Sequence, residues 1–313
     1  MFFSVVIPTY NRADILRKVL EAFYNQSMDE RDYEIIIVND GGSDHTARVV
    51  REFGSQHKNL SYLRQKNSGQ GVARNRGISH AKGEVIVLGQ DDIIPTHDFL
   101  YEHQKFHYLF PGENDAVLGF TAWHPELKIN QYMKWVVNGS SILGRFGGQQ
   151  FAYEKLHGKA TADYNFFYTS NISVKTSLFK KFPFDPDFDG YGWEDIELGY
   201  RLQKKAGLKL HYNSWAVAYH YHEMDERSLP SRMEAVGRSS WILQKKAPEL
   251  AKVPGLFKYL VLSLISSWPV VSTLKIIKTV SRDKYHGLYY YMLSKRYFLK
   301  GLKKGRKKLA NLL

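Results

Sequence analysis

Short, mainly apolar runs alternate with helical segments through the first ninety residues of the chain. Runs such as YEIIIV at 33–38 and VIVL at 85–88 lack the polar–apolar alternation of half-exposed strands, so they predict strands buried on both faces. Strands that alternate with helices at this spacing predict a parallel sheet covered by helices on both sides. We expect strands at 3–7, 33–38, 60–63 and 85–88, and helices at 14–25, 46–53 and 71–80.

Polar or acidic residues directly follow three of these expected strands. Open parallel sheets bind their ligands at the carboxyl ends of the strands, so these segments place the candidate site. The segments are Pro8-Thr9-Tyr10-Asn11, Asn39-Asp40 and Gln90-Asp91-Asp92.

The remaining chain has a less regular pattern. We expect short strands at 116–120 and 171–174, and a helix that begins after Trp193. Residues 208–222 predict a strand, a turn and a second strand. From Ser228 onward the pattern is helical to the end.

Asp40 and Arg74 each allow two interpretations. Asp40 follows a buried strand and precedes two glycines, so it can accept hydrogen bonds from a nucleobase or ribose, or it can cap the following helix as a turn residue. Arg74 lies in GQGVARNRGI, where the glycines let the backbone approach a ligand. It can meet phosphate or pair with Asp40, or it can be a surface arginine at a plain helix start.

Asp91 and Asp92 end a buried strand. Their hard oxygens suit Mg²⁺ or Mn²⁺, which usually bind through one or two carboxylates plus substrate phosphates. The alternative is the capping of a helix ahead of Pro95. Because a buried acid pair is costly without a counter-charge, we favour a functional role.

Glu194 and Asp195 open the helix that follows Trp193. The helix dipole favours carboxylates there, and this stabilisation alone can explain them. A carboxylate beside an aromatic wall is equally what general-base chemistry needs. His220 and His222 offer neutral nitrogen ligands for a divalent metal, although a lone histidine is more often structural. A strand places both histidines on one face, so the sequence does not separate them.

Five ordered blocks resemble the family 2 glycosyltransferases, which have a GT-A fold. VVIPTYNR resembles the family's opening strand and loop, VNDGGSDHT its VDDGSTDxT, NSGQGVARNRGI its NxGxxxARNxGI, and GEVIVLGQDD its GExxxFLDxD. GWEDIELGYRL is similar to a galactosyltransferase-type segment. The resemblance covers roughly residues 2–222. It implies an α/β GT-A domain over 1–225, with a Rossmann-like mixed, mainly parallel sheet flanked by helices, followed by a basic α-helical module over 226–313.

The resemblance also implies roles for single residues. Asp195 falls on the catalytic base, with Glu194 beside it, and Trp193 and Tyr191 lie on the acceptor side. Asp92 takes the metal-binding place for Mn²⁺ or Mg²⁺, with His220 as second ligand and His222 as the alternative. Gln90 departs from the family's first Asp and brings no charge. The implied nucleotide-sugar site comprises Pro8, Thr9, Tyr10, Arg12, Asp40, Gly69, Arg74, Gln90 and Asp91.

The implied activity is inverting, metal-dependent transfer of a sugar, with a UDP-sugar as the expected donor. The acceptor is a hydroxyl of a glycan or lipid-linked saccharide, in the synthesis of cell-surface polysaccharide or glycoconjugates. A nucleotidyltransferase is one alternative, but it usually carries a Gly-rich phosphate loop where this chain has PTYNR. An inactive sugar-nucleotide-binding module is another, and Gln90 is its only support.

Basic charge is concentrated at the C-terminal end. The chain carries 44 Lys and Arg against 31 Asp and Glu, a net charge of +13. Sixteen of these basic residues and two acids lie after Gln244, so residues 1–244 sum to −1. The positive charge therefore says little about the region that carries the candidate site. We find no nucleic-acid-binding module that would explain it. With no cysteine, the chain lacks disulfides, thiolate zinc sites and thiol catalysis.

The basic region predicts contact with an anionic membrane surface. Residues 295–313 place Phe298, Leu302, Leu309 and Leu312/Leu313 on one helical face with Lys and Arg around it. The alternative is a surface helix whose apolar face packs on the protein. The window 259–271 is too short for a confident span of about 20 residues, and the N-terminus shows no signal peptide. We expect a cytoplasmic protein, peripheral at the inner face of the membrane.

Overall fold

The computed structural model describes residues 1–139, 150–250, 252–281 and 285–310, and the chain divides into two compact units. The first comprises Met1–Leu127, Tyr153–Asp189 and Glu194–His222. The second comprises Lys128–Ala152, Gly190–Trp193 and Glu223–Leu313. The second unit thus takes in two segments from the region before residue 225.

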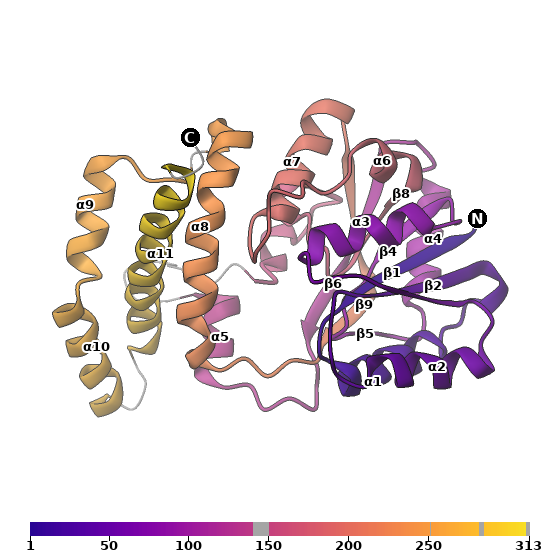
Figure 1. Cartoon of the computed structure of the whole chain (residues 1–313), viewed down its shortest axis with the longest axis horizontal. Helices are drawn as coiled ribbons and strands as arrows, with labels where there is room; N and C mark the ends of the chain where they lie inside the picture. The colour runs from indigo at the N-terminus through magenta and orange to yellow at the C-terminus, as the bar shows by residue number, and fades with distance from the viewer. Residues whose placement is uncertain (140–149, 251, 282–284, 311–313) are drawn as a thin grey trace. The chain divides into compact units, whose positions relative to one another are not determined.

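Four parallel strands form the first half of the sheet in the first unit, in the order β3-β2-β1-β4. β1, β2 and β4 are buried along their whole length, as their apolar runs predict. Strands and helices alternate as expected (Figure 1). The elements are β1 (Phe3–Thr9), α1 (Ala13–Phe23), β2 (Tyr33–Asn39), α2 (Thr46–Gln56), β3 (Leu60–Arg64), α3 (Gln70–His80) and β4 (Val85–Leu88).

The two faces of these strands bury different helices. Val5 and Ile7 share one hydrophobic cluster with Leu16 and Leu20 of α1. Val6, which points the other way along β1, faces α3, where a Cβ added to Gly77 would lie only 2.4 Å from its Cγ1. The glycine therefore lets α3 lie close against the sheet and brings its N-terminus to the carboxyl ends of the strands.

The second half of the sheet is mixed. β8 (Ile172–Lys175) runs antiparallel to β4 and β6, whereas β6 (Asp115–Trp123) and β9 (Lys209–His220) run parallel to each other. The order continues β4-β8-β6-β9-β5, with β5 (Ile93–Pro95) on the edge and β7 (Thr161–Ala162) on β9. The flanking helices are α4 (Phe99–Leu109), α6 (Thr176–Lys181) and α7 (Glu194–Ala206). This is the mixed α/β architecture that the resemblance implied.

One expectation for this half is wrong. Residues 208–222 form no strand–turn–strand: β9 is a single strand that bulges where its partner passes from Gly119 to Phe120. Side-chain amides hold the bulge, because Asn213 Oδ1 accepts from the Trp215 amide (3.0 Å) and Asn171 Nδ2 donates to the Ala216 carbonyl (2.9 Å). These bonds satisfy backbone groups that leave the ladder.

The second unit is helical. Its helices are α5 (Gln131–Asn138), α8 (Leu229–Lys246), α9 (Leu256–Ile265), α10 (Trp268–Val280) and α11 (His286–Ala310). α8 and α11 lie side by side in Figure 1. Their backbones nearly touch, because a Cβ on Gly237 would lie 2.2 Å from the Phe298 carbonyl oxygen and one on Gly301 the same distance from that of Glu234.

This packing corrects the expectation for residues 295–313. Leu302 is 3% exposed and shares a buried cluster with Leu299 and Leu262 of α9, while Phe298 packs against it. The apolar face of α11 therefore covers its own unit here, as the alternative interpretation had it. Leu312 and Leu313, like the side chain of Leu309, lie outside the described residues.

Candidate active site

The carboxyl ends of β1, β2 and β4 meet at one edge of the sheet. Thr9 pairs with Asn39 in the register of β1 and β2, and the Asp40 amide donates to the Thr9 carbonyl at 2.9 Å. Pro8 and Thr9 are buried, whereas Tyr10 is half-exposed. The Tyr10 amide donates to Asp91 Oδ2 at 3.4 Å, which joins this loop to the acids after β4.

Asp40 shapes the loop that leads into α3. Its carboxylate accepts from Gln65 Nε2 (2.8 Å) and from the amides of Ser68 and Gly69 (both 2.9 Å). Gly69 adopts φ +92°, a conformation that favours glycine. A carboxylate has roughly four acceptor positions, so Asp40 keeps capacity for a ligand hydroxyl. Arg74 is not among its partners in the described chain, and the Thr46 amide at the start of α2 donates to Asp44 rather than to Asp40.

Arg12 and His220 lie against the buried acid pair. Asp91 and Asp92 are 8% and 4% exposed. The Arg12 guanidinium reaches both, with Nη1 3.4 Å from Asp91 Oδ1 and in contact with Asp92 Oδ2. His220 Nε2 lies 3.4 Å from the same Asp92 oxygen. Strand β5, rather than a helix, follows the pair, so helix capping does not account for these acids.

The sheet itself brings His220 to Asp92. β5 pairs antiparallel with β9 so that Ile93, the residue after Asp92, lies opposite His220. The Tyr221 amide donates to the Asp92 carbonyl at 2.7 Å. His222 lies beyond the end of β9, with its ring 5.8 Å from that of His220. Between the two histidines that the sequence left open, the geometry thus favours His220 as the partner of Asp92.

The surroundings shift the pKa values of the two acids in opposite directions. Burial and the charge of Asp92 raise the pKa of Asp91 above its ordinary range. Burial also opposes ionisation of Asp92, but its hydrogen bond to His220 and the charges of His220 and Arg12 hold the pKa of Asp92 well below its usual value. Asp92 is therefore the fixed negative charge of the site.

The donor set around Asp92 fits a hard divalent cation. Asp92 Oδ1 is buried and has no hydrogen-bond partner among the described residues, and carboxylate oxygen with imidazole nitrogen suits Mn²⁺ or Mg²⁺. Within the described ranges no group of three or more His, Asp or Glu could hold a metal. The remaining ligands would have to come from substrate phosphates and water, as is usual for these ions. Gln90, half-buried before the pair, adds no carboxylate.

Glu194 and Asp195 begin α7 as expected. Asp195 is partly exposed and accepts a hydrogen bond from the Ile196 amide at 2.8 Å. The surrounding protein atoms and the charge of Glu194 raise the pKa of Asp195 to about 7. A carboxyl group with such a pKa can take up a proton near neutral pH.

Arg74 pairs with Glu194 of α7 rather than with Asp40. Its side chain is fully buried, with Nη1 3.8 Å from Glu194 Oε1 and Nη2 donating to Gln70 Oε1 at 3.2 Å. Its guanidinium lies 5.4 Å from the centre of the Phe184 ring. Burial lowers the pKa of Arg74, while the charges of Glu194, Asp195 and Asp91 oppose that change. All these groups therefore share one electrostatic neighbourhood.

Tyr191 and Trp193 belong to the second unit. Trp193, at φ +75°, donates its indole N–H to the Val236 carbonyl (3.1 Å) and to Ser240 Oγ (3.0 Å). The Lys252 ammonium lies 5.0 Å from the centre of its ring. Tyr191 is 48% exposed, and its hydroxyl accepts from Arg232. The Trp193 ring is thus anchored on α8, and of this pair Tyr191 is the more accessible.

Two features of this site do not follow from the sequence interpretation. Arg12 is expected in the nucleotide-sugar site, but not as the counter-charge of Asp91 and Asp92 that the structure shows. The ion-pair partner of Arg74 is Glu194, which is none of the alternatives that the sequence left open. A signal existed for the first, because a buried acid pair demands a cation and PTYNR supplies one at the neighbouring strand end. No signal existed for the second, since Glu194 is 120 residues away.

A sheet of this topology, with acids at its parallel strand ends and a histidine returned by a late strand, defines the GT-A class of folds. The mannosyltransferase PcManGT from Pyrobaculum calidifontis, solved with GDP-Man and Mn²⁺, has a similar structure: TM-score 0.63 at 17% identity, over 97% of this chain and 86% of that one. At this identity the likeness concerns the fold.

The sequence model described as Glycosyl transferase family 2 matches residues 4–162, and the chain belongs to this family. A chondroitin synthase of Escherichia coli is 30% identical over 268 residues, 78% of this chain and 38% of its own length. A dolichyl N-acetyl-alpha-D-glucosaminyl phosphate 3-beta-D-2,3-diacetamido-2,3-dideoxy-beta-D-glucuronosyltransferase of Methanococcus voltae is 26% identical over 84% of this chain and 81% of its own. The matched region covers only 58% and 54% of the length of two further relatives.

Proposed function

We propose that this protein transfers a sugar from a nucleotide sugar, with a UDP-sugar as first choice, to a hydroxyl of a saccharide or lipid-linked acceptor. The observation that carries the proposal is that the site holds two acids of different kinds. Asp92 is kept ionised beside His220 and Arg12, whereas Asp195 has a pKa of about 7. Family membership and relatives named for polysaccharide synthesis and for transfer to a dolichyl-linked sugar support it.

The donor binds at the carboxyl ends of β1, β2 and β4. Asp40 accepts from the ribose or base with its remaining acceptor position, and the half-exposed Tyr10 offers its ring to the base. Arg12, Gly69 and Gln90 line the same edge, and Asp91 holds the Tyr10 amide. Arg74, wholly buried, acts on this pocket through α3 and Glu194 rather than by direct contact.

Asp92 and His220 would hold Mn²⁺ or Mg²⁺. Bound there, the cation supplies Lewis-acid stabilisation of the negative charge that develops on the leaving diphosphate. Arg12 keeps Asp92 ionised and oriented, because its guanidinium bridges both carboxylates. The Asp92 oxygen that lacks a hydrogen-bond partner in the described chain is the one we assign to the cation.

Asp195 is the general base. It takes the proton of the acceptor hydroxyl while that oxygen attacks the anomeric carbon, and the bond from that carbon to the nucleoside diphosphate breaks. A single displacement inverts the anomeric centre. A pKa of about 7 matches a base to this task at neutral pH. Glu194 contributes by raising that pKa and by balancing the buried charge of Arg74. We assign Trp193 and Tyr191 to binding of the acceptor, as the resemblance implies.

We further propose that the protein works at the cytoplasmic face of a membrane, as a peripheral protein of cell-surface polysaccharide or glycoconjugate synthesis. The basic residues after Gln244 would attract anionic lipid headgroups. A lipid-linked acceptor would make such a location useful. The Methanococcus voltae relative, whose name gives a dolichyl N-acetyl-alpha-D-glucosaminyl phosphate as acceptor, supports this choice.

Asp195→Asn tests the proposal. The variant should lose all but a trace of nucleoside diphosphate release with acceptor present, while its affinity for the nucleotide sugar stays within about threefold, since the donor site lacks Asp195. Asp32→Asn, the same change at an exposed residue, is the matched control and should behave as wild type. Unchanged turnover in Asp195→Asn would remove this residue from the mechanism.

A further inference from the structure

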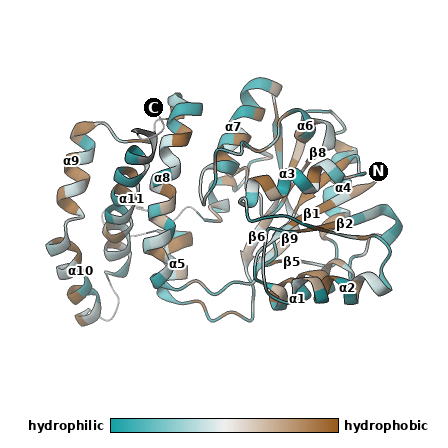
Figure 2. Cartoon of the chain, viewed as in Figure 1, coloured by the Kyte–Doolittle hydropathy of each residue, from teal (hydrophilic) through white to brown (hydrophobic). Residues whose placement is uncertain are grey.

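α9 and α10 expose an unusually large apolar surface. Leu256, Phe257, Leu264 and Val280 are each more than 70% exposed, and Ile276 is 65% exposed. Figure 2 shows the brown, hydrophobic colour along both helices. Single exposed apolar residues are ordinary, but a contiguous set on neighbouring helices marks an interaction surface. Leu256, Phe257, Leu260, Val261, Leu264, Trp268, Ile276, Ile277 and Val280 make up this apolar face.

The apolar face lies on the outside of its unit. On α9, Leu256, Leu260 and Leu264 recur every four residues and form one stripe. The opposite side of α9 buries Leu262 against Leu299 and Leu302 of α11. α9 thus has two apolar sides: the side with Leu262 packs against α11, and the side with the stripe is exposed.

Basic residues flank this face. Lys258 on α9 and Lys275 on α10 are exposed, as are Lys303, Arg306 and Lys307 on α11. Arg296 lies over the exposed ring of Trp268, with its guanidinium 4.9 Å from the ring centre. The only acid of the chain after Glu249 is Asp283, which lies outside the described residues. The surroundings of the apolar face are therefore strongly positive.

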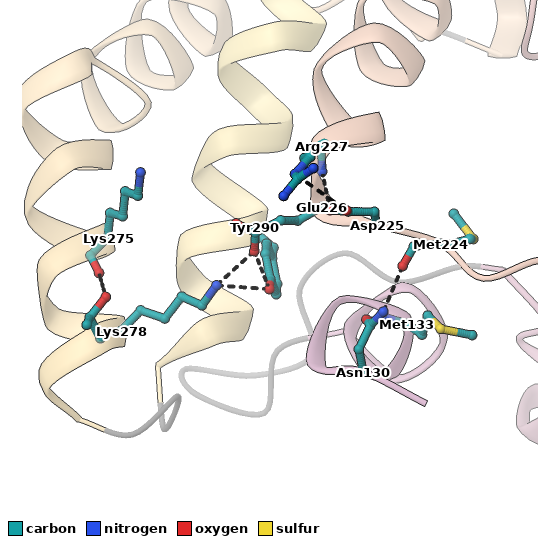
Figure 3. Close-up of polar contacts among 10 residues, drawn as sticks. Asn130, Met133, Met224, Asp225, Glu226, Arg227, Lys275, Lys278 and Tyr290 are labelled. Atoms are coloured by element: carbon teal, nitrogen blue, oxygen red, sulfur yellow. Dashed lines mark hydrogen bonds and ion pairs between the residues drawn. The ribbon is translucent and has the colours of Figure 1, made fainter. Parts of the chain in front are cut away.

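Lys278 of α10, unlike these exposed basic residues, is largely buried and has a structural role. Its ammonium donates to Glu226 Oε2 at 2.8 Å and to the Tyr290 hydroxyl at 3.1 Å, and that hydroxyl donates to the same carboxylate at 2.7 Å (Figure 3). This triad ties α10 to α11 and to the turn before α8. The position of α10 within its unit is thereby fixed while its other side stays exposed.

Neither helix is long enough to cross a bilayer. In the described chain no single helix has the length and hydropathy of a membrane span, and α9 and α10 pass such a test only together, across a bend of 45°. Ten and thirteen residues correspond to about 15 and 20 Å of helix, against a hydrocarbon core of about 30 Å. Each helix alone thus reaches only about half to two thirds of the way through that core, and we consider the arrangement in which both lie in one leaflet.

We propose that α9 and α10 form a membrane wedge: their apolar face enters one leaflet of an anionic bilayer, and the flanking Lys and Arg bind the lipid headgroups. The proposal rests on the membrane location proposed above and assigns it to these helices instead of α11. Charge decides between a bilayer and a second copy of the chain. Two copies packed through this face would bring their basic residues together, whereas anionic lipid complements them.

Vesicle flotation with the full chain tests the wedge. Leu264→Gln combined with Ile276→Gln removes apolar side chains without a change in charge, at positions too exposed to be needed for folding. Wild type should float with vesicles that contain phosphatidylglycerol, and less with phosphatidylcholine alone or at high salt. The double variant should bind about tenfold more weakly or worse. Leu109→Gln, at a 61% exposed residue of the first unit, is the control and should float as wild type.

Three results would overturn the wedge. The first is flotation of the double variant equal to wild type. The second is an equal loss in the Leu109→Gln control. The third is that the wild type forms a dimer, the double variant is a monomer, and neither binds vesicles. The apolar face would then bind a second copy of the chain. Nucleotide-sugar affinity of the same variants in free solution should stay unchanged. Asp195→Asn should still float, so a failed wedge and a failed catalytic proposal are distinguished.

Discussion

At the scale of single residues, the environment gives neighbouring acids different protonation behaviour. Asp92 is held ionised by His220 and Arg12, whereas burial and Glu194 raise the pKa of Asp195 to about 7. Such a division supplies one fixed charge and one proton acceptor, which are the two functions that displacement at an anomeric carbon requires.

The pKa of Asp195 predicts the acid limb of the pH–rate profile. The base acts only when ionised, so kcat/KM should rise with pH up to about 7 and level off above it. Glu194→Gln removes the negative charge that raises this pKa and leaves the positive charge of Arg74 nearby. We expect the limb to move to lower pH in this variant. A limb that stays in place would exclude Asp195 as the titrating group.

The buried His103 predicts acid sensitivity of the fold. His103 lies between Ser173 and Asn171, at 2.8 and 2.9 Å, and burial lowers its pKa to about 4. In the unfolded chain it titrates near 6.5, so the unfolded state binds more protons between these values. The contribution of His103 to the free energy of unfolding should fall by roughly 3 kcal/mol from pH 7 to pH 4. Urea unfolding at several pH values measures this, and a pH dependence in His103→Gln that is smaller by about this amount identifies the residue.

At the scale of elements, glycines decide how the helices pack. Gly301 and Gly237 let the backbones of α8 and α11 touch, and the triad of Lys278, Glu226 and Tyr290 fixes α10. These contacts turn the apolar side of α11 inward.

Gly301→Ala should destabilise the second unit by about 1–3 kcal/mol, because its methyl group would overlap the Glu234 carbonyl. Gly54→Ala in α2 is the matched control. Nothing lies within 4 Å of the position of its added Cβ, so helix propensity should make it neutral or up to about 1 kcal/mol stabilising. Thermal unfolding compares the two. If both variants melt as wild type does, the helices are not in such close contact.

The elements also show where sequence reasoning succeeds. β1, β2 and β4 are predicted because strands buried on both faces are mainly apolar, without polar–apolar alternation. The bulge of β9 is not, because it depends on Asn171 and Asn213, which act across the sheet. The inward face of α11 and the Arg74–Glu194 pair are missed for the same reason: their partners are distant in sequence and leave no periodic signal. Asp91, Asp92 and His220 could be singled out from the sequence because they lie at or shortly after the ends of strands.

At the scale of the whole molecule, charge and chemistry are separated along the chain. Residues 1–244 are nearly neutral and gather their acids at strand ends, while the positive charge follows Gln244. Binding of the nucleotide sugar should therefore depend on Asp92 and change little when the exposed Lys303 and Lys307 are replaced by Gln, which should instead weaken vesicle binding. Donor affinity and flotation of the same Lys303→Gln/Lys307→Gln protein check this division, and a loss of donor affinity would contradict it.

The most direct measurement is a thermal shift of the full chain with a panel of nucleotide sugars, each with and without Mn²⁺. A ligand that binds only the native state raises Tm with its concentration. We predict that one nucleotide sugar, with a UDP-sugar as first choice, raises Tm in the presence of Mn²⁺. Asp92→Asn should lose the part of the shift that needs the metal. No shift with any nucleotide sugar, with or without Mn²⁺, would contradict a nucleotide-sugar-dependent glycosyltransferase.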